Sequence, residues 1–104
     1  MSIVIVATAV PKPEYRDDVI AAFEKAEEAV HPAEEGCLLY ALHEGQDGRL
    51  VMIEKYTDQA AIDAHVKGAG LAALVAELKG KLEGPMDVQV LTPRPAGSPD
   101  KGAL

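Results

Sequence analysis

The stretch CLLYALHEGQDGRLVMIEKY, residues 37–56, contains two apolar segments on either side of a short polar sequence. The middle of that sequence, Gln46-Asp47-Gly48, includes the Asp-Gly pair that favours tight hairpin turns. The flanking segments, 37–44 and 49–56, are rich in the aliphatic and aromatic residues typical of strands. The stretch therefore predicts an antiparallel hairpin, formed by the second and third strands of the chain.

The residues before the hairpin predict one strand and one helix. Residues 2–10 are rich in β-branched side chains and apolar on both faces, which is typical of a strand covered on both sides. Prolines at 11 and 13 end this strand. From residue 14 to about residue 30, apolar side chains recur at helical spacing, and Pro32 and Gly36 indicate the helix end and the following loop.

The residues after the hairpin predict an interrupted helix. Thr57 or Asp58 is placed to cap its start, with Ala61, Ile62 and His65 on the inward face. Gly68 and Gly70 predict a break or bend, after which a second helical segment runs to the glycines at 80–84.

The end of the chain predicts a last strand and a tail. Residues 86–92 alternate, so Met86, Val88 and Val90 are expected to form a buried face opposite Asp87 and Gln89. Residues 93–104 contain three prolines and no periodicity, which predicts a disordered or loosely docked tail. We therefore expect one folded domain over residues 1–92 and a tail over 93–104.

The order of elements, β-α-β-β-α-α-β, predicts a ferredoxin-like α+β fold of the split βαβ type. Its helices would cover one face of an antiparallel sheet. Because the first three predicted strands are apolar on both faces, a single chain would expose a large apolar sheet surface. Pairing of two copies through their sheet faces would cover it, so the pattern predicts a homodimer, a dimeric α+β barrel.

Composition limits the classes of partner. The 104 residues include seventeen acidic and ten basic side chains, giving a net charge of −7, which argues against nucleic acid or an anionic membrane. A single cysteine, Cys37, excludes an internal disulfide framework. The apolar N-terminus has no basic segment before it and is too short to span a bilayer, so we expect a cytoplasmic protein.

Two polar residues stand where the pattern asks for apolar ones. Glu54 alternates with apolar residues on the inward face of the third strand, and His65 lies on the inward face of the following helix. Either they are buried, hydrogen-bonded anchors or they line a reactive cavity, with His65 as a base because histidine titrates near neutral pH.

Tyr40, Tyr56 and His43 are further candidates for binding a substrate. By strand alternation, Tyr40 shares a face with Leu38 and Leu42, and Tyr56 shares one with Glu54. His43 would share the opposite face with Cys37, Leu39 and Ala41. The tyrosine hydroxyls can hold a substrate oxygen, although core or dimer-interface positions explain these residues equally well.

The chain resembles the antibiotic biosynthesis monooxygenase family, which includes quinol monooxygenases. The residues that carry the resemblance are Gly36-Cys37, Tyr40, Glu54-Lys55-Tyr56 and Ala64-His65, in the order and spacing of the family pattern. The chain departs from that pattern twice. It has Gly70 where many members have a second histidine, and Tyr56 where tryptophan is frequent.

The resemblance implies a cofactor-independent monooxygenase in which O₂ reacts directly with a deprotonated phenolic, quinol or polyketide-like aromatic substrate. It implies that Glu54, Tyr56 and His65 can border a substrate pocket. Together with the strand and helix patterns, this makes His65 and Glu54 the candidate catalytic residues and Tyr40, Tyr56 and His43 the candidate substrate-binding residues, and we expect no metal. Two alternatives stay open: a dimeric barrel of this fold that binds a hydrophobic small molecule without turnover, and a haem-binding or haem-degrading protein. The order of elements alone does not choose among them.

Overall fold

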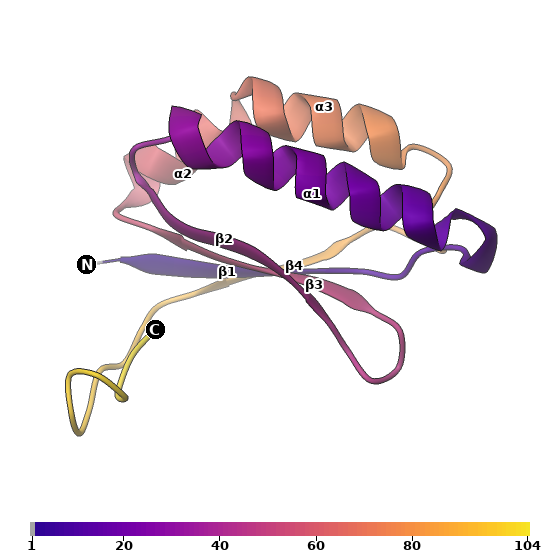
Figure 1. Cartoon of the computed structure of the whole chain (residues 1–104). Helices are drawn as coiled ribbons and strands as arrows, with labels where there is room; N and C mark the ends of the chain where they lie inside the picture. The colour runs from indigo at the N-terminus through magenta and orange to yellow at the C-terminus, as the bar shows by residue number, and fades with distance from the viewer. Residues whose placement is uncertain (1) are drawn as a thin grey trace.

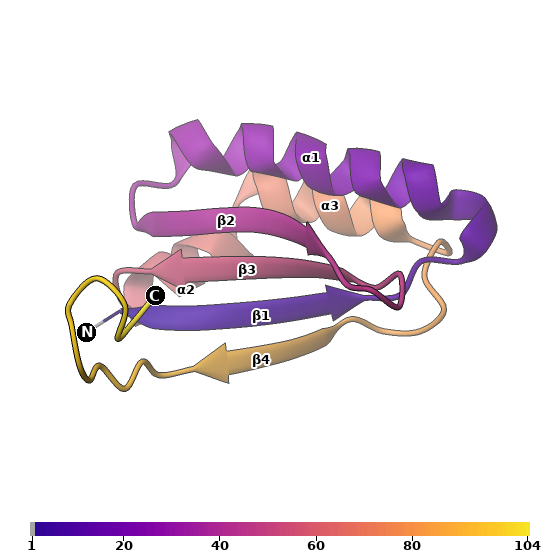
Figure 2. The same cartoon turned by 60° about the horizontal axis from the view of Figure 1, so that its bottom comes forward.

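The computed structural model, which describes residues 2–104, has one four-stranded antiparallel sheet with its helices on one face (Figure 1). Along the chain the elements are β1 (Ile3–Ala9), the 3-10 turn η1 (Pro13–Tyr15), α1 (Arg16–Ala33), β2 (Cys37–Glu44), β3 (Leu50–Tyr56), α2 (Gln59–Val66), α3 (Ala69–Leu78) and β4 (Asp87–Leu91). The strand order β2-β3-β1-β4 places the first and third strands in the centre, as Figure 2 shows. This order confirms the predicted ferredoxin-like α+β fold.

The main core lies between α1, α3 and the helix-facing side of the sheet. Of the apolar side chains on the predicted first helix, Val19, Phe23 and Val30 are buried there, whereas Ile20 is partly buried at the edge. α1 ends at Ala33, one residue after Pro32, so Pro32 lies in the last turn, at the helix end that it was predicted to indicate. A proline in the last turn removes only one helical hydrogen bond, and that turn tolerates it here.

The predicted hairpin is confirmed by the pairing of β2 and β3. Gly45 N–H donates to the Arg49 carbonyl (2.8 Å), and Gly48 has a φ of +87°, which a side chain would strain. At the start of β2 a bulge shifts the register, so that Cys37 pairs with Tyr56 and Leu39 with Lys55.

Because of this bulge, the predicted side-chain faces of two residues were wrong. Because residues paired across strands share a face, Cys37 lies on the helix side with Tyr56 instead of sharing a face with Leu39. Leu38 does not share the buried environment of Tyr40, since it is 54% exposed.

The predicted helix interruption is also confirmed. Asp58 caps α2, because its Oδ1 accepts a hydrogen bond from the Ala61 N–H (2.9 Å). α2 ends at Val66, and Gly68 is the N-cap of α3, whose first turn contains Gly70. The short α2 crosses the end of the sheet where β2 begins and β3 ends (Figure 2).

The expected burial of the last strand was wrong for a single chain. Val88 and Val90 pair with Ala7 and Ile5 and therefore point to the helix side, yet they are 54% and 62% exposed. β4 is the edge strand next to β1, and the close contacts of α1 and α2 with the sheet are made to β2 and β3, so within residues 2–104 these valines stay largely uncovered. Residues 93–104 continue past β4 without a helix or strand (Figure 1).

The face of the sheet opposite the helices is largely apolar. The register places seven apolar side chains on it: Val4, Val6, Leu39, Ala41, Val51, Ile53 and Leu91. In the views of Figures 1 and 2 no helix covers this face, which we call the open face. No helix within residues 2–104 has the length and apolar character needed to cross a bilayer.

Candidate functional site

Glu54 and Tyr56 lie two residues apart on the helix side of β3, near its end. The Tyr56 hydroxyl donates a hydrogen bond to Glu54 Oε1 (2.6 Å), and both residues are almost completely buried. Strand alternation explains the pair, because residues i and i+2 project from the same face. The structure therefore brings together two of the residues singled out in the sequence.

His65 faces this pair from α2 and is 5% exposed. Its Nε2 atom lies 3.8 Å from Glu54 Oε1, which is too far for a hydrogen bond. Its imidazole ring lies between two tyrosines, with centroid distances of 5.3 Å to Tyr40 and 5.3 Å to Tyr56. Four predicted site residues, Tyr40, Glu54, Tyr56 and His65, thus form one cluster between α2 and the sheet.

Glu34 is a fifth member of this cluster, and the sequence pattern did not predict it. It is the C-cap residue of α1, and its Oε1 lies 2.7 Å from Nδ1 of His65. A residue in a loop carries no periodic signal, so nothing in the pattern placed its side chain inward. The feature of the sequence that could have indicated an inward position for Glu34 is its place just before Gly36, in the loop that must pass the start of α2.

Burial dominates the electrostatics of the cluster. It raises the pKa of Glu54, an effect that the hydrogen bond from Tyr56 and the nearby His65 partly oppose. Burial likewise raises the pKa of both Tyr40 and Tyr56, and the carboxylate of Glu54 raises each further. Both phenols therefore remain protonated at neutral pH and can act as hydrogen-bond donors.

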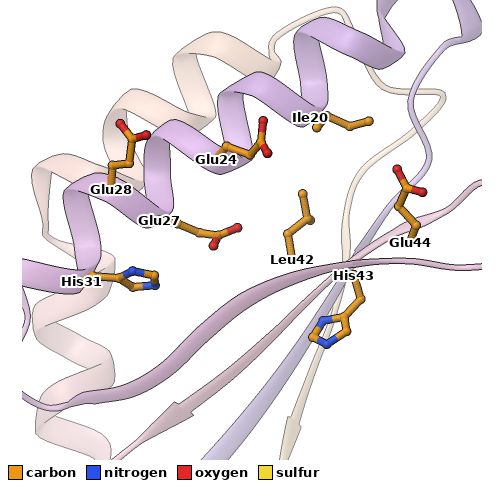
Figure 3. A pocket seen from close by; sticks show the side chains of 8 residues that line it. All are labelled: Ile20, Glu24, Glu27, Glu28, His31, Leu42, His43 and Glu44. Atoms are coloured by element: carbon orange, nitrogen blue, oxygen red, sulfur yellow. The ribbon is translucent and has the colours of Figure 1, made fainter.

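His43 is not part of this cluster. It pairs with Val51 on the open face, is exposed, and its Nδ1 lies 3.1 Å from the Ala41 carbonyl oxygen. Figure 3 shows its imidazole on the far side of β2 from Leu42, which points toward α1. Of the five candidate residues, His43 is therefore the one that the fold separates from the others.

Two cavities open beside the edge strand β2. One, of about 340 Å³, includes Cys37 and Tyr40 in its wall, together with Glu27, His31, Leu38, Leu39 and Ala41. The other, of about 500 Å³, lies further along the α1–β2 groove and is lined mainly by acidic side chains (Figure 3). Neither cavity is lined by His65 or Glu54. Tyr40 is the residue that belongs both to the wall of a cavity and to the cluster.

The described residues contain no obvious metal centre. Within residues 2–104, no three histidine, cysteine or carboxylate side chains are grouped in a way that could hold a metal ion. Glu34 and Glu54 approach His65 from opposite ring nitrogens, at 2.7 Å from Nδ1 and 3.8 Å from Nε2.

Comparison with known proteins agrees with this architecture. The family model for antibiotic biosynthesis monooxygenase matches residues 2–77. The chain is 35% identical over 79 residues to the "Putative monooxygenase YcnE" of Bacillus subtilis (strain 168), an alignment that covers 74% of this chain and 82% of YcnE.

Solved structures give the same result. Rv0793 from Mycobacterium tuberculosis superposes with a TM-score of 0.86 at 29% identity, covering 94% of this chain and all of Rv0793 (100%). A solved antibiotic biosynthesis monooxygenase gives a TM-score of 0.81 at 27% identity, covering 89% of this chain and 99% of that one. Since the family model spans both the sheet and the helix that carry the cluster, this chain belongs to the antibiotic biosynthesis monooxygenase family.

Proposed function

We propose that this protein is a cofactor-independent monooxygenase that oxidises a phenolic or quinol-type aromatic with O₂, and that His65 is its base. One observation carries the proposal. The Nε2 atom of His65 makes no hydrogen bond to any of residues 2–104, although the side chain is almost completely buried, lies beside two tyrosine rings, and places this atom 3.8 Å from a carboxylate. An imidazole nitrogen held in this way is suited to take a proton from a bound hydroxyl group.

The reaction balances without an external reductant. In a phenol whose para carbon carries a hydrogen, His65 removes the phenolic proton, and the para carbon of the phenolate forms a C–O bond to O₂, giving a peroxide that takes the proton back. Loss of the hydrogen on that carbon, with cleavage of the O–O bond, then releases water and leaves a para-quinone. The substrate supplies four electrons, and the two oxygen atoms end in the quinone and in water.

Tyr56 and Tyr40 are assigned different roles in this proposal. The Tyr56 hydroxyl is committed to Glu54 at 2.6 Å, so Tyr56 helps to fix the carboxylate. The Tyr40 hydroxyl has no hydrogen-bond partner in the part of the chain that the structure describes, and its raised pKa keeps it protonated. Tyr40 is therefore assigned the contact with the substrate oxygen, where a phenolic donor stabilises the negative charge of the phenolate. Glu54 stabilises the imidazolium that forms on His65.

Substrate access is proposed through the cavity of about 340 Å³ beside β2, because Tyr40 is in its wall. A rotation of the Tyr40 side chain would connect this cavity with Nε2 of His65. The wall of this cavity includes Leu38 and Leu39, which suit an aromatic ligand.

The proposal includes a homodimer formed through the open faces of two sheets. The seven apolar side chains of that face are packed against no helix of their own chain. Val4 is already buried in the single chain, and contact across a dimer would remove the exposed surface of the other six from water at a gain of about 25 cal/mol per Å². The clusters around His65 lie on the opposite sides of the two sheets, so each chain would keep its own site.

A second function, binding of a hydrophobic small molecule without turnover, has one observation in its favour. Neither cavity at β2 is lined by His65 or Glu54, so the cluster can also serve as a buried polar anchor. In that case ligand binding in the Tyr40 cavity would proceed without chemistry at His65.

Oxygen consumption distinguishes the monooxygenase from a protein that only binds its ligand. Purified, chelator-treated protein is mixed with naphthols, anthrols and hydroquinones, and dissolved O₂ and quinone absorbance are followed together. We expect one O₂ consumed per quinone formed from a naphthol. His65→Ala should lower the rate by about 100-fold or more, the scale of general base catalysis. Lys67→Ala, an exposed change just after the same helix, should have no effect. Ligand binding without O₂ uptake on any substrate would favour the second function.

A further inference from the structure

The contact between Glu34 and His65 is the shortest polar contact of the histidine. Nδ1 lies 2.7 Å from Glu34 Oε1, and the two side chains are only 6% and 14% exposed. Because a carboxylate can only accept at this contact, the proton between the two atoms belongs to Nδ1. Glu54 does not compete for the ring, because its Oε1 accepts from Tyr56 and lies 3.8 Å from Nε2.

The backbone of Glu34 is held from both sides. Its N–H donates to the Val30 carbonyl (3.1 Å), and its own carbonyl accepts from the Cys37 N–H (3.1 Å). Gly36, two residues further along this loop, packs closely against α2, since a Cβ on Gly36 would lie 2.4 Å from the Cβ of Ala61. Ala61 and His65 are one helical turn apart, so the loop is fixed against the helix face that carries the histidine.

Gly68 makes room for the second carboxylate oxygen of Glu34, because a Cβ at this position would lie 3.3 Å from Oε2. Gly68 is the N-cap of α3, where the helix dipole favours a negative charge. The loop thus places the carboxylate, Gly68 accommodates it, and its Oε1 contacts Nδ1 of His65.

We propose that Glu34 is a positioning residue that holds His65 in the tautomer with its proton on Nδ1, leaving Nε2 as the basic nitrogen beside Tyr56 and Glu54. The catalytic consequence rests on the proposed function, whereas the tautomer does not. Orientation by a second carboxylate matters because an imidazole in the other tautomer would present an N–H, rather than a lone pair, to the substrate.

The tautomer is measured directly by ¹⁵N NMR of histidine-labelled protein, which distinguishes a protonated from an unprotonated ring nitrogen. His65 is identified by the signals missing in His65→Gln. His31 is an internal reference, because its Nε2 contacts the Tyr40 carbonyl oxygen (2.8 Å) and must therefore carry the proton. In the wild type we expect His65 to be protonated at Nδ1, the opposite pattern to His31.

Glu34→Leu and Glu34→Ala, which offer the Nδ1–H no acceptor, should each lose the single Nδ1–H pattern of His65. The matched control Glu35→Gln, an exposed neighbour, should keep it. If Glu34→Ala does not fold, Glu34→Leu decides alone, since its side chain fills most of the same space without an acceptor. An unchanged Nδ1–H pattern in the folded Glu34 variants overturns the proposal.

Kinetics add a second readout in an active enzyme. Glu34→Leu should lower kcat by about tenfold or more with a smaller change in KM, because ring orientation acts in the transition state. If the Glu34 variants change the tautomer but the wild type oxidises no substrate, the proposed function is wrong and the positioning role of Glu34 stands. If the wild type oxidises substrate but the variants keep the tautomer, the proposed function stands and the positioning role of Glu34 is wrong.

Discussion

The Tyr56 hydroxyl donates a 2.6 Å hydrogen bond to Glu54 Oε1, from two residues further along the same strand. Tyr56 is 0% and Glu54 is 5% exposed, so the bond satisfies a carboxylate that has almost no access to water. The pair shows how this fold keeps a charge-bearing group in its interior. It also leaves the imidazole of His65 free to contact Glu34 instead.

Removal of that hydroxyl should destabilise the protein. Tyr56→Phe keeps the ring but leaves Glu54 Oε1 without its donor, at a cost of about 1–3 kcal/mol in the free energy of unfolding. The measurement is urea denaturation at neutral pH. Tyr15→Phe, a change at a tyrosine that is 37% exposed, is the matched control and should have an effect within about 0.5 kcal/mol. Equal effects of the two variants would contradict the assigned hydrogen bond.

Glu54 should make stability fall as the pH rises. Burial raises its pKa in the folded protein above the ordinary value of 4.5, so the folded state holds the proton more tightly than the unfolded state. The contribution of Glu54 is therefore fully present below pH 4.5 and is lost as the pH rises through the raised pKa. Glu54→Gln stays neutral, and its stability relative to the wild type should increase across that interval. Thermal unfolding of both proteins at several pH values tests this, and parallel profiles would rule it out.

The inward placement of Glu54 and His65 could be predicted because periodicity reports which side of an element a residue occupies. Glu54 alternates with apolar residues along β3, and His65 follows Ala61 and Ile62 at helical spacing. Both side chains indeed face the space between α2 and the sheet. That they approach to 3.8 Å follows from the packing of α2 on the sheet, which the pattern does not contain.

Residues outside regular periodicity could not be placed. Glu34 lies in a loop, so neither a helical nor a strand repeat points to it. The bulge at Cys37 inserts one residue into the alternation and moves the thiol to the other face. Val88 and Val90 do point to the helix side, but the edge position of β4, a property of the tertiary fold, leaves them exposed.

Gly36 should tolerate no side chain. In Gly36→Ala the new methyl would lie 2.4 Å from the Ala61 Cβ, so the loop and α2 must separate. Such overpacking costs about 1–3 kcal/mol. The control is Gly84→Ala, where a Cβ would meet nothing within 4 Å. Chemical denaturation should give the Gly36 variant a much lower free energy of unfolding than the wild type, and the Gly84 variant a value close to that of the wild type. Equal stability of both variants would show that the loop and α2 are not packed this closely.

Cys37 should react slowly with thiol reagents. Burial, followed by the charge of Glu34, raises its pKa to about 11, so little thiolate is present at pH 8. The colour released by a disulfide reagent measures the rate, which should rise by an order of magnitude or more on unfolding in guanidinium. Glu34→Gln should increase the native rate, because it removes the second cause of the shift. A native rate equal to the unfolded rate would contradict the buried thiol.

The open face offers the sharpest test of the homodimer. Val6 and Ile53 are directly paired neighbours on β1 and β3, in the centre of that face and opposite Ala41. Ile53→Lys would bury a charge in a face-to-face dimer, whereas in a monomer the ammonium group would simply enter water. We therefore expect sedimentation to show a dimer for the wild type and a monomer for Ile53→Lys, with circular dichroism unchanged. Val75→Lys makes the same apolar-to-charged change on α3, at a side chain that is 62% exposed, and should remain dimeric. Because Val75 lies on the helix side, dissociation caused by Val75→Lys but not by Ile53→Lys would assign the interface to the helices and overturn the sheet-to-sheet arrangement.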